Sequence, residues 1–420
     1  MEVEVKKIKT DIGTDIIFNF KLNKDQGDVT ESVSFNAGNS KIKLKSTKAS
    51  FSFPFDLALP HNDLIALAAL KIISPYVGRK ITFNHPVSHD FATYVKAEYP
   101  KIQEINSSDI PPRTALNREK YAVSFSGGAD SVAAANISPD GTPLILLARK
   151  LHPEIGKYES WYRTDGNLET LKSMQDRFVK IPVLSDFEYL SVNMDDKFCV
   201  YPDAYAFTIP CILLADHLGL TGILTGDMAA AFTNSERNGY FDQRYNKRRM
   251  LYRAVGLDLQ SAIKGITEIG TEIINNYYGN GENSNTCQYG GFRKPCMKCI
   301  KCFRKSLIRS FLKGEKLTDE QLKAFDNSPA IKNFVSQERM PFPLTFKLVT
   351  QGYNWSSYPN LNKIMEKVRD IPVRKQLLSY SMDPYKEEII PETIQFCLKN
   401  IKRIFKDKIE FDIKDAFYKQ

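Results

Sequence analysis

The residues with the clearest capacity for chemistry form a glycine-rich segment, Ser126-Gly127-Gly128-Ala129-Asp130-Ser131, near the middle of the chain. It follows a short apolar stretch and opens a run of small residues typical of a helix. Glycines let a backbone approach a ligand closely, and the first N–H groups of a helix attract phosphate. Asp130 cannot attract phosphate by charge, so we expect it to cap backbone N–H groups or to meet Mg²⁺. The Lys-Ser/Thr ending of a Walker A loop is missing.

A second chemical feature is a cluster of four of the seven cysteines, with the spacing Cys287-x8-Cys296-x2-Cys299-x2-Cys302. Four thiolates around one Zn²⁺ make a closed, tetrahedral structural site. An iron–sulfur cluster and free or redox-active thiols are the alternatives. Because a zinc ion with four protein ligands has no open position, we expect it to stabilise the fold. We expect Cys199, Cys211 and Cys397 to be buried core thiols.

The composition of the 420 residues, 42% hydrophobic and 25% charged, is that of an ordinary globular protein. No apolar run reaches the roughly 18 residues of a membrane-spanning helix, and the first residues lack the apolar core of a secretory signal. With clustered thiols in so large a chain, we expect a cytoplasmic protein without membrane contact. The positive net charge of +9 is concentrated in one part of the sequence, because residues 287–310 contain seven basic residues and no acid. This favours an anionic ligand.

The elements that must position these residues follow from hydrophobic periodicity. Apolar residues alternate over about residues 1–58 and predict strands, and a helix is expected at 62–74 with Asn62 as N-cap. A short strand at 81–83 and a helix at 88–98 precede a linker at 105–118. Strands then alternate with helices, which predicts a parallel sheet: strands at 121–125, 143–148, 187–192 and 222–225, and helices at 131–136, 167–178 and 205–218. Helices dominate after residue 303, including 390–405.

This pattern predicts an α/β protein of three parts. Residues 1–112 form a β-rich α+β accessory domain, and residues 119–310 form an α/β domain that carries the glycine-rich segment and the four cysteines. Residues 311–420 form a helical accessory region. The length suits two or three domains at the usual domain size.

The segment Ser126–Ser131 matches the SGGxDS signature of the PP-loop ATP pyrophosphatases, and the cysteine quartet follows about 160 residues later. The combination resembles the 7-cyano-7-deazaguanine synthase family of queuosine biosynthesis over about residues 119–310. The resemblance implies a parallel-sheet, HUP-like (adenine nucleotide alpha hydrolase) fold that binds ATP, Mg²⁺ and Zn²⁺, and it makes residues 119–310 an ATP-binding catalytic domain with a zinc site. It also implies an AMP-forming ligase that adenylates the carboxylate of 7-carboxy-7-deazaguanine. Ammonia then displaces AMP, and a second ATP-driven step turns the amide into a nitrile.

The resemblance also implies roles for individual residues. Ser126 to Ser131 and Gly226 would bind ATP, and Asp130, Asp227 and Arg304 would be catalytic. Tyr240, Asp242 and Arg244 lie in a stretch similar to the family's Gly-Tyr-Pro-Asp-Cys-Arg and would contact the substrate, with Phe241 and Gln243 departing from that pattern. The family's Arg-Asn pair is absent after Pro202.

The flanking regions have no counterpart in the minimal synthase. Extended relatives serve other pathways, including antiviral defence, where the activated carboxylate goes to another amine. The extensions would bind a protein partner, and a homodimer is compatible with the resemblance.

Two alternatives to this function stay open. One is a tRNA-modifying PP-loop enzyme, which would need a catalytic thiol such as Cys199 or Cys211. The other is a nucleotide-binding subunit without turnover.

Overall fold

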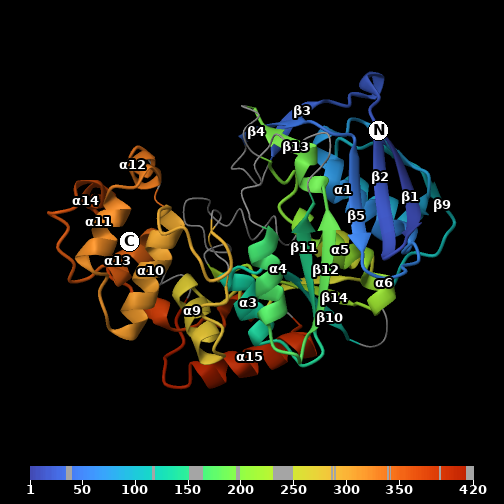
Figure 1. Cartoon of the computed structure of the whole chain (residues 1–420). Coiled ribbons are helices and arrows are strands. Elements are labelled where there is room, and N and C mark those ends of the chain that lie inside the picture. The colour runs from blue at the N-terminus through green and yellow to red at the C-terminus, as the bar shows by residue number, and fades with distance from the viewer. Residues whose placement is uncertain are drawn as a thin grey trace.

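The computed structural model describes residues 1–34, 40–115, 119–150, 164–194, 199–229, 249–284, 287, 290–337, 340, 342–386 and 389–412. Its centre is one large, mostly parallel sheet with the strand order β15-β14-β10-β11-β12-β5-β2-β1-β6-β8 (Figure 1). The chain is therefore a mixed α/β protein, with a β-rich N-terminal part and a helical C-terminal part.

The parallel half of the sheet consists of β10 (Tyr121–Phe125), β11 (Pro143–Arg149), β12 (Val179–Ser185), β14 (Gly222–Thr225) and β15 (Asp258–Ser261). The chain runs from β10 outward to β11 and β12, then returns to pair β14 with the other side of β10. The direction of winding thus reverses between β10 and β14. In open α/β sheets, ligands bind at the carboxyl ends of the strands at such a reversal.

Helices cover both faces of this half of the sheet. Alternate residues of each buried strand therefore enter opposite cores. Val123 of β10 packs with α3 (Ala129–Asn136), whereas Ala122 packs with α1 (Asn62–Ile73) and α5 (Ile209–Leu213). Helix α4 (Thr164–Ser173) contacts β11 and β12. The helix α3 that follows the glycine-rich loop is therefore fixed against the sheet.

The N-terminal strands extend the same sheet in mostly antiparallel pairing. The strands β1 (Glu2–Thr10), β2 (Gly13–Lys21) and β5 (Lys48–Phe53) pair in sequence, and β5 joins the parallel half through two residue pairs with β12. Beyond β1, the large sheet continues with β6 (Lys80–Phe83) and β8 (Glu104–Ile105). The short strands β7 (Val87–Ser88) and β9 (Ser107–Ser108) pair with each other in a separate sheet. Helix α2 (His89–Glu98) follows β7. A small sheet holds β3 (Glu31–Ser34), β4 (Ser40–Leu44) and β13 (Ser191–Asn193).

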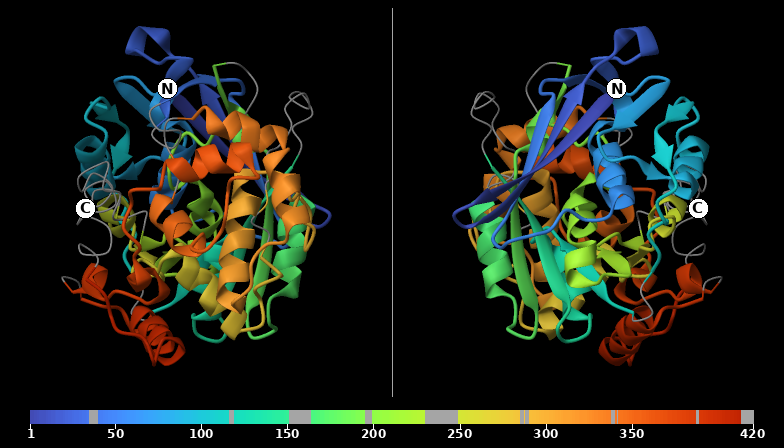
Figure 2. Two further views of the ribbon diagram at one scale, coloured as in Figure 1. Left: turned by 90° about the vertical axis from the view of Figure 1, so that its left-hand side faces the viewer. Right: turned by 90° about the vertical axis from the view of Figure 1, so that its right-hand side faces the viewer.

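The C-terminal helices lie on the α3 side of the sheet (Figures 1 and 2). They are α9 (Glu268–Tyr277), α10 (Ile300–Lys313), α11 (Asp319–Asp326), α12 (Pro329–Val335), α13 (Pro343–Val349), α14 (Pro359–Glu366) and α15 (Glu392–Ile404). Ile394 and Ile401 of α15 share a core with Val132 of α3, so the end of the chain packs against the helix of the glycine-rich loop. Within the described residues, every helix falls short of the length and apolar character that membrane crossing needs.

Several predicted elements have other bounds or another form. The third parallel strand is β12, and the predicted strand at 187–192 is instead a buried 3₁₀ turn, Phe187–Leu190, followed by β13. Its apolar residues enter the core without extended pairing. The predicted helix at 205–218 is broken into a 3₁₀ turn, α5 and α6 (Ala215–Leu218). The predicted helix at 167–178 begins and ends earlier, as α4, and His61 rather than Asn62 caps α1.

Candidate nucleotide-binding cleft and four-cysteine cluster

The glycine-rich loop connects β10 to α3 in a geometry that leaves backbone N–H groups available. Gly127 has φ +73°, in the left-handed region that glycine adopts without strain. Gly128 is the N-cap of α3 and supplies no side-chain cap, so the first-turn N–H groups lack a side-chain acceptor. The hydroxyls of Ser126 and Ser131 lie 3.0 Å apart and close the loop on itself. This arrangement suits an anion at the helix N-terminus.

The loop lines a cleft of about 370 Å³ at the reversal between β10 and β14. Gly226, at the end of β14, packs directly on the start of α3, because a Cβ there would lie 2.8 Å from the backbone nitrogen of Ser131. The far wall comes from α9, α10 and the residue before α13. The described lining residues with polar or aromatic side chains are Ser124, Phe125, Ser126, Asp130, Ser131, Arg149, Asn167, Tyr201, Phe207, Asp227, Glu268, Lys301, Arg304, Lys305 and Phe342.

Two half-buried carboxylates, Asp130 and Asp227, lie in this cleft. Burial raises the pKa of Asp130, while Lys305 partly opposes that rise. Burial likewise raises the pKa of Asp227 to about 6, and the nearby charge of Asp130 adds to the rise. The Thr225 hydroxyl donates to Asp227 at 2.7 Å, but Oδ1 of Asp130 has no hydrogen-bond partner among the described residues. A buried carboxylate oxygen without a partner, beside a second acid, fits a hard divalent cation such as Mg²⁺.

The basic side of the cleft is held by buried ion pairs between α9 and α10. Arg304 donates through Nε to both oxygens of Glu268, at 3.1 and 2.8 Å. Lys305 lies 3.3 Å from Glu268 and 3.3 Å from Glu272, and Arg309 also contacts Glu272. Burial alone would lower the pKa of Lys305, but the two glutamates raise it above its usual value. The cleft therefore keeps fixed positive charge opposite the loop.

A hydrogen-bonded network of buried asparagines holds the end of the glycine-rich loop, where α3 begins. Asn275 of α9 donates to the carbonyl oxygen of Ala129 at 2.9 Å and accepts from Asn136 at 3.1 Å. Asn280 donates to Asn136, and Asn283 donates to Asn280. The network reaches toward the cysteine cluster through Arg293, which donates to Asn283. It therefore links the start of α3 to the segment that carries the cysteines.

We expect Asn275→Ala to lower the free energy of unfolding by about 1–3 kcal/mol, because it leaves buried partners unsatisfied. We also expect weaker ATP binding, since the carbonyl oxygen of Ala129 loses its donor. Denaturant titration and ATP binding by calorimetry measure both effects. The exposed neighbour Asn276, replaced by alanine, is the control. Equal effects of the two substitutions would contradict a positioning role for Asn275.

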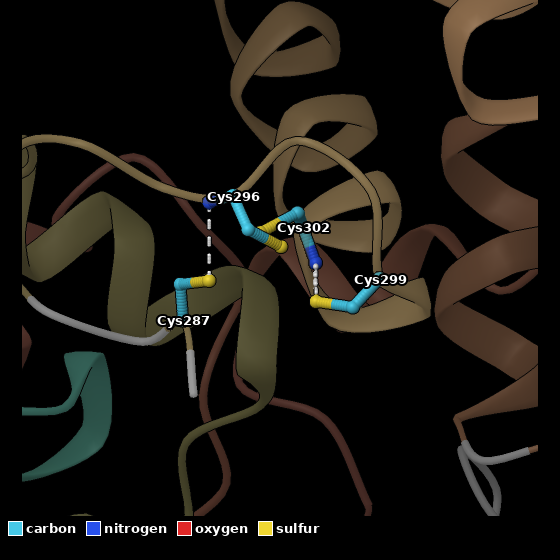
Figure 3. A group of neighbouring side chains, drawn as sticks. All are labelled: Cys287, Cys296, Cys299 and Cys302. Carbon is cyan, nitrogen blue, oxygen red and sulfur yellow. Dashed lines mark hydrogen bonds between the residues drawn. The ribbon is translucent and has the colours of Figure 1, made fainter. Parts of the chain in front are cut away.

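The four cysteines of the predicted metal site lie together, with ligand atoms all within 4.8 Å of one another (Figure 3). The sulfurs of Cys296 and Cys302 are 3.7 Å apart, close to the edge of about 3.8 Å of a tetrahedron with zinc–sulfur bonds of about 2.3 Å. Backbone N–H groups of Gly290 and Cys296 donate to the sulfur of Cys287, as is usual around metal thiolates. A four-cysteine cluster compatible with Zn²⁺ is therefore present.

The cluster adjoins the cleft through α10. Cys299 is the N-cap of this helix, and its sulfur accepts from the backbone N–H of Cys302 in the first turn. The same helix carries Lys301, Arg304 and Lys305 into the cleft. A metal held at the start of α10 would therefore fix the helix that provides the positive charge.

The structure brings together most of the residues predicted from sequence. Ser126, Gly128, Ala129, Asp130, Ser131, Gly226, Asp227 and Arg304 all line the cleft, and Gly127 lies within the loop. Tyr240, Asp242 and Arg244 lie outside the described residues. Sequence reasoning missed Glu268 and Phe342 as cleft residues. Lys301 and Lys305 belong to the acid-free basic segment 287–310, which had indicated an anionic ligand.

A larger hollow of about 990 Å³ lies over the polar face of β1, β2 and β5. It contains none of the residues predicted to do chemistry. Its charged lining residues carry both signs, including Glu2, Asp15, Lys21 and Lys48. The cleft at the glycine-rich loop is therefore the better candidate for the functional site.

Comparison with known proteins gives one match, to the family of unknown function DUF6395, over residues 247–410. That segment contains β15, the cysteine cluster, the basic side of the cleft and α15, but not the glycine-rich loop. No curated protein and no solved structure matches the chain. The matched family model thus shows similarity to a family without an assigned activity.

Proposed function

We propose that the chain is an ATP-dependent ligase that releases AMP and pyrophosphate and activates a carboxylate by adenylation. The observation that carries the proposal is at Asp130, whose Oδ1 has no hydrogen-bond partner among the described residues and which lines a cleft shared with an uncapped helix N-terminus and two lysines. The resemblance to 7-cyano-7-deazaguanine synthases supports ATP as the nucleotide and 7-carboxy-7-deazaguanine as the acid. ATP and Mg²⁺ binding belong to this proposal.

In the proposed reaction, a carboxylate oxygen of the acid attacks the α-phosphorus of ATP. The bond from that phosphorus to the bridging oxygen breaks, and pyrophosphate leaves. Ammonia or another amine then attacks the acyl carbon, the bond to AMP breaks, and the amine loses a proton to solvent. No nucleophile from the chain is needed.

The residues of the cleft have distinct roles in this scheme. The loop N–H groups and Ser126 orient the triphosphate, and Lys301 and Lys305 offset its charge. Asp130 and Asp227 would hold Mg²⁺. When bound, that ion neutralises negative charge on the phosphates as pyrophosphate departs. Zn²⁺ at the four cysteines would keep α10 in place and take no part in the chemistry.

The two alternatives differ in their support. A thiolating tRNA-modifying enzyme needs a reactive thiol, yet the described cleft lining contains no cysteine. Burial raises the pKa of Cys211 to about 12 and that of Cys199 to about 11, which opposes thiolate formation. A nucleotide-binding subunit without turnover remains the second candidate, because the Arg-Asn pair of the synthases is absent after Pro202.

Pyrophosphate release tests the proposal. We expect release to depend on both ATP and 7-carboxy-7-deazaguanine and to be lost in Ser126→Ala. If the protein binds ATP but releases no pyrophosphate even when the acid is present, the subunit without turnover would be favoured. Failure of the protein to bind ATP at all would overturn the assignment of the loop.

The raised pKa of Asp227 gives a pH prediction. The folded-state pKa of about 6 lies above the ordinary aspartate value of 3.8, so the stability from this group is present below about pH 4 and lost as pH rises through 6. Asp227→Asn should therefore raise the melting temperature of the nucleotide-free protein at pH 8 and change it little at pH 4. The gain corresponds to about 3 kcal/mol at most. Thermal unfolding at both pH values measures it, and a loss of stability at pH 8 would contradict it.

A further inference from the structure

One wall of the cleft is provided by Phe342, from the helical region for which the sequence indicates no chemical role. Phe342 is the N-cap of α13 and has φ +57°, in the left-handed region. That conformation is unfavourable for a bulky residue and is retained where surrounding structure demands it, often at ligand sites. Its side chain lines the cleft together with Arg304.

Arg304 is oriented by two contacts that leave part of its guanidinium available. Glu268 accepts from Nε, and the guanidinium carbon lies 4.3 Å from the centroid of the Phe342 ring. The two terminal nitrogens have no hydrogen-bond partner among the described residues. Arg304 is nevertheless largely buried, at 5% exposure. A held guanidinium with unused terminal N–H groups is suited to a carboxylate.

The three cations of α10 that line the cleft differ in the groups they contact. Burial raises the pKa of Asp130, in the glycine-rich loop, and the positive charges of Lys305 and Lys301 both act to lower it. Arg304 pairs with Glu268, as Lys305 does, but its guanidinium also packs on the ring of Phe342. The two lysines are therefore placed for the triphosphate, and the terminal N–H groups of Arg304 beside Phe342 are placed for a second anion.

We infer that Arg304 and Phe342 form the subsite for the acid that is activated, and that Phe342 is a specificity-determining residue of the reaction. Arg304 takes the carboxylate through its terminal N–H groups. Phe342 holds the guanidinium in place, excludes water from it and offers an apolar surface to the skeleton of the acid. This inference rests on the proposed function, and it makes the C-terminal helical region part of the site.

Binding of MgATP and of 7-carboxy-7-deazaguanine, measured separately by calorimetry on the full chain, tests the inference. We expect Phe342→Leu to weaken binding of the acid about tenfold, within the range of a desolvated cation–π contact, and to change MgATP affinity less than twofold. Phe342→Tyr keeps the aromatic ring and should restore acid binding. Phe396→Leu, at an exposed phenylalanine of α15, is the matched control and should change neither.

The outcomes separate the inference from the proposed function. Equal effects of Phe342→Leu on both ligands, or none, overturn the inference and leave the proposed function intact. A wild-type protein that binds MgATP but not the acid also overturns the inference. A wild-type protein that binds neither ligand contradicts the proposed function itself.

Discussion

Asp130→Asn is expected to reduce ATP turnover by about two to three orders of magnitude while leaving the protein folded. The substitution removes a negative charge proposed to hold Mg²⁺, and the charge stabilisation that such an ion supplies is worth several kcal/mol. Because burial raises the pKa of Asp130, an uncharged side chain of the same shape fits the nucleotide-free cleft at least as well. Turnover should therefore fall without a lower melting temperature.

Asp140→Asn is the matched control for this prediction. Asp140 is exposed and pairs with Arg177 on the surface, away from the cleft. We expect turnover close to that of the wild type. If Asp130→Asn retains full turnover, the assignment of the loop to the phosphates of ATP is wrong.

Cys302→Ser is expected to remove the metal and weaken ATP binding at the same time. The metal content should fall from about one zinc per chain to near zero, because three sulfurs bind zinc much less tightly than four. The free energy of unfolding should fall by about 3 kcal/mol or more, since the cluster adjoins a core that includes Phe303 and Phe346. ATP affinity should also drop, because the same helix carries Lys301 and Lys305.

Cys199→Ala separates loss of the metal from loss of any thiol. Cys199 is half-buried and lies outside the cluster, so metal content and ATP affinity should stay at wild-type values. Elemental analysis and ATP calorimetry on both variants make the measurement. Visible absorbance of an iron–sulfur cluster in the wild type would contradict zinc. Unchanged metal content in Cys302→Ser would contradict the site.

The parts of the site that the sequence predicts are those whose chemistry lies within one short segment. The loop from Ser126 to Ser131 contains its glycines, hydroxyls and acid in six consecutive residues, so strand, turn and helix follow directly. The cysteine spacing likewise predicts one cluster, which the structure confirms. The strand at 121–125 has the predicted bounds, because a mainly apolar run between turn signals favours a buried strand.

Other parts depend on contacts between distant segments and give no local signal. Glu268 lies in an ordinary amphipathic helix, and its partner Arg304 is 36 residues further along the chain. Phe342 precedes a proline in a loop, and only tertiary packing shows that its ring covers Arg304. The buried turn at Phe187–Leu190 is as apolar as a strand, so its pattern cannot distinguish the two forms. The pairing of β5 with β12 is equally non-local.

The identity of the nucleotide product tests the central claim most directly. The purified, zinc-loaded protein is incubated with MgATP, 7-carboxy-7-deazaguanine and ammonia, and the products are identified by mass. The proposal predicts AMP and pyrophosphate in equal amounts, together with the amide or the nitrile of the acid. Formation of ADP and phosphate, or no consumption of ATP, would contradict it.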